Sequence, residues 1–137
     1  QSFNLRAQDK NIRVVTELKP ETPAIHGDIA MMQRVLENLL ENALRHTPSG
    51  GEIRISVDVT DGRVRVRISD NGVGIPSDEI PRIFDRFYQL DATRGQNGNA
   101  GLGLSIVKRI LELHGSMIAV DSSGDKGTTF SFQLLPG

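Results

Sequence analysis

Apolar residues recur with two different periods in the first half of the chain. Between residues 28 and 46 they lie three or four positions apart, which is typical of an amphipathic helix with Asp28 as N-cap. The apolar positions of this helix are Ile29, Met32, Val35, Leu36, Leu39, Leu40, Ala43 and Leu44. Apolar and polar residues then alternate over 52–60 and 63–69, on either side of Asp61-Gly62. That alternation predicts an antiparallel hairpin with one apolar face.

The rest of the chain divides in the same way. Further strands are predicted over 12–18, 117–122 and 128–135, and further helices over 77–84 and 101–114, the last closed by Gly115. Five strands and three main helices predict an α/β (α+β) two-layer sandwich. Its sheet is expected to be mixed but mainly antiparallel, with the helices on one face. Residues 1–137 are expected to form one domain.

Composition agrees with one globular domain and argues against several functions. The chain has 137 residues, of which 37% are hydrophobic, with 16 basic and 17 acidic side chains and no cysteine. This balance gives no general attraction for nucleic acid. Arg63, Arg65 and Arg67 alternate with apolar residues and are expected as a solvated row on the outer face of the sheet. No apolar run is long enough to span a membrane and no signal peptide is visible, so no membrane contact is expected.

Asp70 ends the second hairpin strand, directly before the turn Asn71-Gly72-Val73-Gly74. It continues the phase of the apolar strand residues, so its carboxylate is expected on the covered side of the sheet. A buried charge needs a partner, and the exocyclic amine of a purine is a donor that a carboxylate accepts. The alternative is that Asp70 only caps the turn by binding backbone amides.

A line of polar side chains runs along one edge of the helix over 28–46. Asn38, Asn42 and His46 are spaced four residues apart, and Arg45 lies beside them. Side-chain amides at this spacing can hold a metal ion or a phosphate, with Arg45 and His46 as candidate cations. The alternative is the polar shoulder of an ordinary amphipathic helix.

The last predicted helix begins with a glycine-rich segment, residues 101–104. A helix N-terminus presents unpaired N–H groups and partial positive charge, and glycines let the backbone approach an anion. The segment does not follow a predicted strand, and the chain lacks the Gly-x-x-x-x-Gly-Lys pattern of a P-loop. This helix start is therefore a candidate phosphate site of another kind.

The order of five motifs is more specific than any one of them. The motifs occupy residues 38–43, 70–76, 83–88, 101–104 and 127–130. This series resembles the catalytic, ATP-binding domain of bacterial sensor histidine kinases, in the superfamily that also holds gyrase-type ATPases, Hsp-type chaperones and mismatch-repair ATPases. The resemblance extends from about residue 12 to residue 134 and implies the Bergerat fold, with ATP and Mg²⁺ as cofactors.

The resemblance also implies roles for single residues. Asp70 would read the adenine amine, Asn42 would hold Mg²⁺ with support from Asn38, and Thr128 would complete the adenine contacts. Arg45 and His46 occupy positions near the phosphates. The adenine pocket would be shaped by Gly72, Gly74 and Ile75, and the phosphates received by Gly101, Leu102, Gly103 and Leu104.

Residues 85–100 have no helical or strand periodicity and predict a mobile ATP lid; the alternative is a surface connection with no role. The phenylalanine box of the family matches residues 84–87. Within it, Arg86 is expected to contact phosphate or a partner helix and, with Asn38, to act in catalysis. Many relatives carry a basic residue where this chain has Gln89, so Arg86 or Arg94 would supply that charge.

The chain contains only His26, His46 and His114, and none lies in the sequence context of the family's phosphorylated histidine. The resemblance implies that the acceptor lies on a separate dimerisation domain, with residues 1–10 a remnant of the connection. We therefore expect a protein-histidine kinase catalytic domain that presents the γ-phosphate to that histidine and does not label itself. The expected setting is a cytoplasmic domain of a homodimeric parent, membrane-anchored or not, that signals to a response regulator.

Two other classes share these boxes. Serine kinases of the anti-sigma type generally lack the extended phenylalanine box. Nucleotide-gated ATPases of the gyrase or chaperone type place a glutamate base four residues before the metal-binding asparagine, where this chain has Asn38; Glu37 and Glu41 are its neighbours. A degenerate domain that no longer binds ATP is disfavoured because the boxes are intact.

Overall fold

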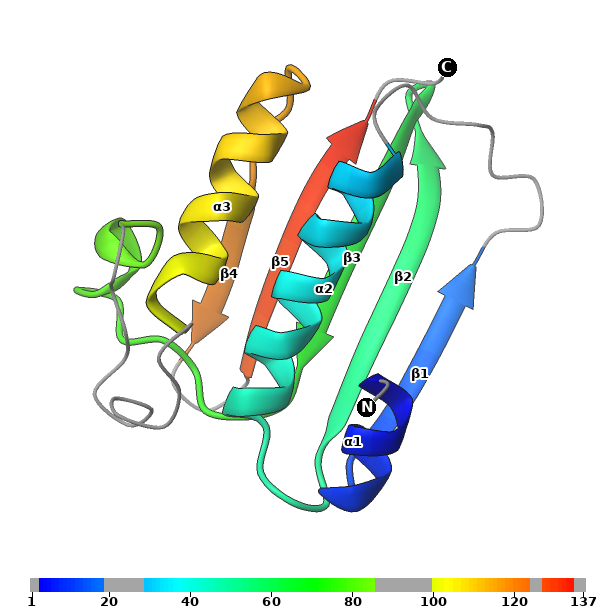
Figure 1. The fold of residues 1–137 in the computed structure, drawn as a ribbon, viewed down its shortest axis with the longest axis vertical. Coiled ribbons are helices and arrows are strands. Elements are labelled where there is room, and N and C mark those ends of the chain that lie inside the picture. The colour runs from blue at the N-terminus through cyan, green and yellow to red at the C-terminus, as the bar shows by residue number, and fades with distance from the viewer. Residues whose placement is uncertain (1–2, 19–28, 86–99, 124–126, 135–137) are drawn as a thin grey trace.

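The computed structural model describes residues 3–18, 29–85, 100–123 and 127–134 (Figure 1). Five strands form one sheet in the order β1-β2-β3-β5-β4, in which only β1 and β2 are parallel neighbours. The described elements are α1 (Phe3–Asp9), β1 (Arg13–Leu18), α2 (Ile29–His46), β2 (Glu52–Thr60), β3 (Arg63–Asp70), the 3₁₀ helix η1 (Ile80–Arg82), α3 (Ala100–Leu113), β4 (Ala119–Ser123) and β5 (Gly127–Leu134).

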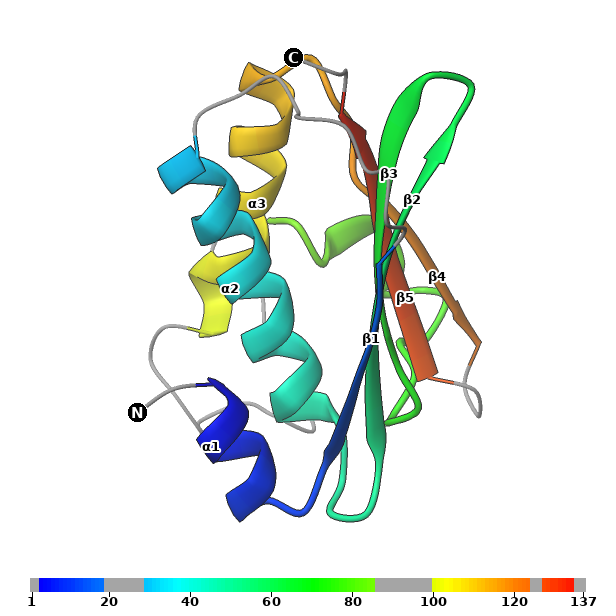
Figure 2. The same cartoon turned by 90° about the vertical axis from the view of Figure 1, so that its right-hand side faces the viewer.

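The three α-helices cover one face of this sheet, and the other face carries no helix in the described part of the chain (Figure 2). The predicted two-layer sandwich with a mixed, mainly antiparallel sheet is therefore confirmed. On β3, every second residue is buried, from Val64 to Asp70, while the arginines between them point to the opposite face. The alternation read from the sequence thus places Asp70 on the helix-covered side.

The core lies between α2, α3 and the inner face of the sheet. Val35 and Leu39 of α2 and Ile53 of β2 are fully buried there. Phe84 packs edge-on against Phe130 of β5, with ring centroids 6.3 Å apart. This contact attaches the segment after the Asp70 turn to the sheet, which fixes one wall beside the candidate site.

The sharp turns follow the sequence signals. Asp61 and Gly62 both have positive φ, as a two-residue hairpin turn of the primed type requires. At the end of α3, Gly115 has φ 71° and donates to Glu112, while Ser116 N–H donates to the Leu111 carbonyl at 2.8 Å. This is a Schellman arrangement, so the prediction of Gly115 as the closing residue is confirmed.

One expectation about a helix is wrong. The predicted helix over 77–84 is only the 3₁₀ helix η1 with flanking turns, whose bonds join residues three apart, such as Arg82 N–H to the Glu79 carbonyl. Pro81 lacks an N–H and disfavours the α conformation before it, so a regular helix does not form. The segment interpreted as a connection contains α1, with Ala7 only 1% exposed. It is too short for its period to be read from the sequence.

Candidate nucleotide-binding site

Asp70 lies at the end of β3 and is 7% exposed. Its Oδ1 accepts a hydrogen bond from Gly72 N–H at 2.9 Å, and the backbone of Thr128 donates to the same carboxyl group. Burial nevertheless raises the pKa of Asp70 to about 6, because two amide donors only partly replace its lost hydration. The capping role considered as an alternative is therefore present. Burial of the charged Asp70 carboxylate still costs free energy, and a further hydrogen-bond donor from a ligand would stabilise it.

The turn after Asp70 packs directly on the end of α2. A Cβ on Gly72 would overlap the His46 carbonyl oxygen and lie 2.8 Å from the Thr47 Cα. Val73 N–H donates to the same His46 carbonyl at 3.1 Å. The close approach requires glycine at position 72, and it joins the segment that carries Asp70 to the helix that carries the asparagines.

Two polar residues that sequence reasoning missed hold this region together. Ser122 Oγ accepts from Ile75 N–H at 2.7 Å, donates to the Gly127 carbonyl at 3.0 Å and lies 3.0 Å from Thr128 Oγ1. Thr47 is fully buried and donates from Oγ1 to the Ala43 carbonyl at 2.6 Å. Neither residue belongs to a recognised motif. The signal in the sequence was a polar residue at a position where the pattern of the neighbouring residues predicts an apolar one.

The asparagines of α2 face in the expected direction. Asn42 is 9% exposed, and its side-chain amide has no hydrogen-bond partner among the residues that the structure describes. Asn38 donates from Nδ2 to the Arg34 carbonyl at 2.9 Å, which leaves its Oδ1 beside α3, 3.3 Å from the position of a Cβ on Gly103. A side-chain amide at this edge offers both an acceptor oxygen and an N–H donor to a ligand.

The start of α3 lies next to this asparagine edge, because α2 and α3 run side by side on the sheet (Figure 1). Gly101 and Leu102 fall in the first turn, where N–H groups have no partner within the helix. Leu104 lies a turn further along, and its side chain packs against the hydrophobic core. The contact with the core explains why residue 104 is apolar. Phosphate contacts are therefore better assigned to the backbone of the first turn of α3, which precedes Leu104.

The two candidate cations at the end of α2 differ in their electrostatics. Burial, with the nearby positive charges of Arg45 and Lys10, lowers the pKa of His46 to about 4. His46 is therefore neutral at pH 7 in the domain without bound nucleotide. Burial also lowers the pKa of Arg45, whose guanidinium nevertheless stays charged. Arg45 thus remains the cationic candidate at the end of α2, and His46 contributes a backbone carbonyl and an uncharged ring.

Helix α1 is attached to the same end of α2. Arg6 forms an ion pair with Glu41, and Lys10 Nζ donates to the Leu44 carbonyl at 2.7 Å. The Glu41 carboxylate is thereby engaged on the side of α1. Several predicted features lie outside the described residues: the N-cap Asp28, Arg86, Arg94, Gln89 and most of the lid over 85–100.

Comparisons with known proteins agree with this geometry. A family model described as histidine kinase-, DNA gyrase B-, and HSP90-like ATPase matches residues 27–137. The alginate biosynthesis sensor protein KinB of Pseudomonas aeruginosa is 40% identical over 136 residues, which cover 99% of this chain and 22% of KinB. Across the first relatives, this chain spans about a fifth to a third of their length.

Two solved structures have the same fold over nearly the whole chain. The catalytic domain of histidine kinase ThkA superposes with a TM-score of 0.84 at 30% identity, covering 97% of this chain and 84% of that one. Full-length ShkA in complex with AMPPNP gives 0.83 at 31% identity, covering 97% and 28%. The chain belongs to the histidine kinase-, gyrase B- and HSP90-like ATPase family, and it is an ATP-binding domain of the histidine kinase type.

Among the described helices, none combines the length and the apolar character needed to cross a membrane. The described residues also contain no group of three or more His, Cys, Asp or Glu side chains that could hold a metal ion.

Proposed function

We propose that this domain binds ATP with Mg²⁺ and presents the γ-phosphate to a histidine supplied by a separate dimerisation domain of its parent protein. Asp70 accepts a hydrogen bond from the adenine amine, Asn42 binds Mg²⁺, and the start of α3 receives the phosphates. The complex of ShkA with the ATP analogue AMPPNP supports the choice of ligand. Adenine fits Asp70 because its amine supplies the donor that this buried carboxylate lacks.

The observation that carries the choice of kinase over hydrolase is the position of Asn38. Its neutral amide oxygen lies beside Gly103 at the start of α3, where the hydrolytic relatives are expected to keep a carboxylate base. Of its two acidic neighbours in α2, Glu41 is engaged by Arg6 and Glu37 is exposed to solvent. With an amide in place of a carboxylate at this position of the described chain, the site favours transfer to a nucleophile stronger than water.

The proposed reaction forms one bond and breaks one. A ring nitrogen of the acceptor histidine attacks the γ-phosphorus, the bond from the γ-phosphorus to the β–γ bridging oxygen breaks, and ADP leaves. Positioning and charge neutralisation supply most of the rate enhancement in phosphoryl transfer. The neutral His46 is not needed as a proton donor, because the leaving diphosphate is stabilised by the metal ion and by the N–H groups at the start of α3.

The remaining parts of the system follow from this role. The parent is a homodimer that passes the phosphoryl group from its dimerisation domain to a response regulator; ThkA has been solved in complex with response regulator TrrA, which supports such a partner. We place the domain in the cytoplasm, where ATP is available. Arg86 or Arg94 would provide the positive charge at the γ-phosphate, in place of the basic residue replaced by Gln89.

The kinase assignment predicts that the isolated domain binds ATP without turning it over rapidly. Incubated alone with γ-labelled ATP, the domain should bind the nucleotide, hydrolyse it slowly and remain unlabelled. With the dimerisation domain of its parent, that partner should acquire an acid-labile, base-stable phosphohistidine, because it supplies the nucleophile. Stable self-labelling, or fast hydrolysis by the domain alone, would instead favour a serine kinase or a gyrase-like ATPase.

The metal assignment predicts that Asn42→Ala abolishes the dependence of ATP affinity on Mg²⁺. One amide oxygen together with phosphate oxygens is sufficient for Mg²⁺, which retains several waters. Calorimetric ATP titrations at increasing Mg²⁺ test this, with Asn38→Ala as the matched control that should keep the dependence. If Asn38→Ala loses it and Asn42→Ala does not, the ligand is Asn38 and the assignment is wrong.

A further inference from the structure

The outer face of the sheet, opposite the helices, carries a network of ion pairs over β1 and β2. Arg54 pairs with Glu17 at 2.9 Å and with Glu52 at 3.0 Å, and Arg13 also pairs with Glu52. Hydrogen bonds from Arg54 and Arg13, respectively, lower the pKa values of Glu17 and Glu52. These arginines are therefore satisfied within the domain.

The row of arginines on β3 is divided. Arg67 lies 3.6 Å from Asp58, whereas Arg63 and Arg65 have no ion-pair partner among the residues that the structure describes. The cross-strand neighbours of Arg65 are the neutral Gln133 on β5 and Asp58 on β2, whose carboxylate lies beside Arg67. A domain that pairs the other arginines of this face thus leaves two guanidinium groups available to an external anion.

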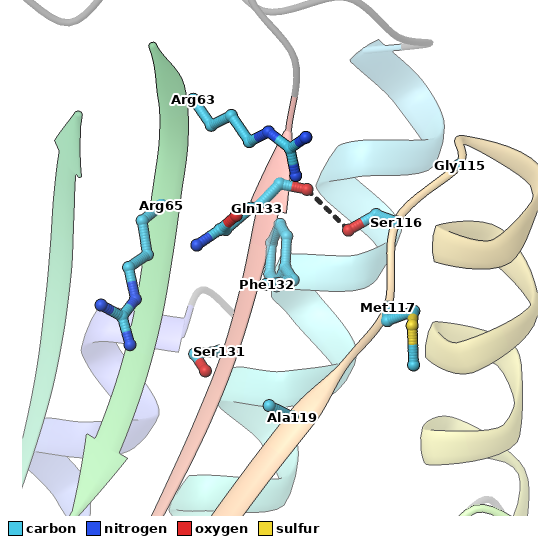
Figure 3. Close-up of a pocket in the computed structure, with 9 residues that line it drawn as sticks. All are labelled: Arg63, Arg65, Gly115, Ser116, Met117, Ala119, Ser131, Phe132 and Gln133. Carbon is cyan, nitrogen blue, oxygen red and sulfur yellow. Dashed lines mark hydrogen bonds between the residues drawn. The ribbon is translucent and has the colours of Figure 1, made fainter. Parts of the chain in front are cut away.

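These two arginines line a groove of about 370 Å³, which we call the basic groove (Figure 3). Its other wall is formed by the segment between α3 and β4, where Ser116 Oγ donates to the Gln133 carbonyl at 2.6 Å. Met117 is 82% exposed beside it. Figure 3 shows the guanidinium groups of Arg63 and Arg65 lying apart, with the Gln133 side chain between them.

We propose that the basic groove binds an acidic segment of a partner polypeptide, in extended conformation, through two carboxylates separated by one residue. Arg63 and Arg65 alternate on one strand, so their positions repeat every two residues, about 7 Å. An extended peptide presents alternate side chains to one side at the same spacing. Met117 provides an apolar surface for a neighbouring side chain of that segment.

The charges around the basic groove favour a peptide over a nucleic acid. Binding to a phosphate backbone depends on a continuous stripe of cations, and here the row of unpaired arginines has only two members. The separated guanidinium groups also fit two carboxylates better than one phosphate.

Fluorescence anisotropy with a labelled peptide, Gly-Ser-Glu-Ala-Glu-Leu-Ser, tests the proposal. Arg63→Gln and Arg65→Gln should each weaken binding about threefold, and the double variant about tenfold, as for exposed ion pairs. Arg109→Gln, which removes an exposed arginine from α3, is the matched control and should bind normally. Replacing both glutamates of the peptide by glutamine should remove the difference between wild type and the double variant.

Two further readouts locate the site and separate it from the ATP site. Backbone NMR signals of Ser116, Met117 and Gln133 should shift with the peptide, while ATP affinity should be unchanged in the double variant. Equal peptide binding by wild type and the double variant would overturn the proposal. A second result would also overturn the proposal: wild type binds a short DNA duplex more tightly than the peptide, and the double variant no longer binds the duplex. The basic groove would then serve nucleic acid.

Discussion

Replacing Asp70 by asparagine should weaken ATP binding about 10- to 100-fold, the effect of losing a hydrogen bond to a charged group. The carboxylate can only accept, so it matches the adenine amine and opposes the carbonyl that GTP carries at that position. Wild type should therefore prefer ATP strongly, and Asp70→Asn should bind the two nucleotides more equally. Calorimetric titrations with ATP and GTP measure both effects. Equal affinities in the wild type would refute the adenine assignment.

The same substitution should make the empty domain more stable. The pKa of Asp70 is raised from 3.8 to about 6, a shift that corresponds to about 3 kcal/mol. Because the folded state binds this proton more tightly, the stabilisation is fully present below about pH 4 and is lost as pH rises through 6. At pH 7, Asp70→Asn should therefore raise the free energy of unfolding by about 1–3 kcal/mol, measured in urea.

ATP affinity should depend on pH in the opposite direction. Protonation of Asp70 below about pH 6 removes the acceptor for the amine, so wild-type affinity should fall more steeply with acidification than that of Asp70→Asn. Titration of ATP itself affects both proteins and cancels in the comparison. Asp121→Asn, an exposed aspartate on β4, is the matched control and should leave affinity and stability unchanged. If Asp70→Asn is instead less stable than wild type, the hydrogen bonds of the carboxylate stabilise the fold by more than its burial costs.

Gly127→Ala should destabilise the domain by about 3–5 kcal/mol and abolish ATP binding. Gly127 has φ 81°, and a Cβ there would overlap the Asp70 carbonyl oxygen and lie 2.9 Å from the Asn71 Cα. These are backbone atoms that cannot turn aside, so β5 must separate from β3 at the point where Thr128 meets Asp70. This loss is a large part of the free energy of unfolding, because folded domains are stable by only about 5–15 kcal/mol.

Gly62→Ala measures the cost of positive φ alone, without the steric overlap found at Gly127. Gly62 also has positive φ, at 76°, but a Cβ there meets nothing within 4 Å. It should cost only about 1–2 kcal/mol, the penalty of the left-handed conformation itself, and leave ATP affinity intact. Urea denaturation and calorimetry on both variants check the comparison. Similar losses for the two alanines would show that steric overlap at Gly127 is not the cause.

The sequence by itself determined the parts of the fold that local periodicity encodes. The long apolar pattern of α2 and the alternation around Asp61-Gly62 predicted one helix and two strands, which the structure reproduces nearly to the residue. Strand phase alone placed Asp70 on the covered face, because side chains alternate by geometry. The order of the motifs was sufficient to indicate the family, since it depends on residue types and spacing.

Only the tertiary structure decided properties that depend on neighbours distant in the chain. Burial and two nearby cations make His46 neutral, and no pattern within α2 reveals the contribution of Lys10. Ser122 became a structural link because β4 and β5 bring it to Ile75 and Thr128. The availability of Arg63 and Arg65 likewise depends on which acidic residues the sheet order β1-β2-β3-β5-β4 places beside them. Pairing and desolvation are set by such non-local contacts, whereas periodicity reports only which face a residue occupies.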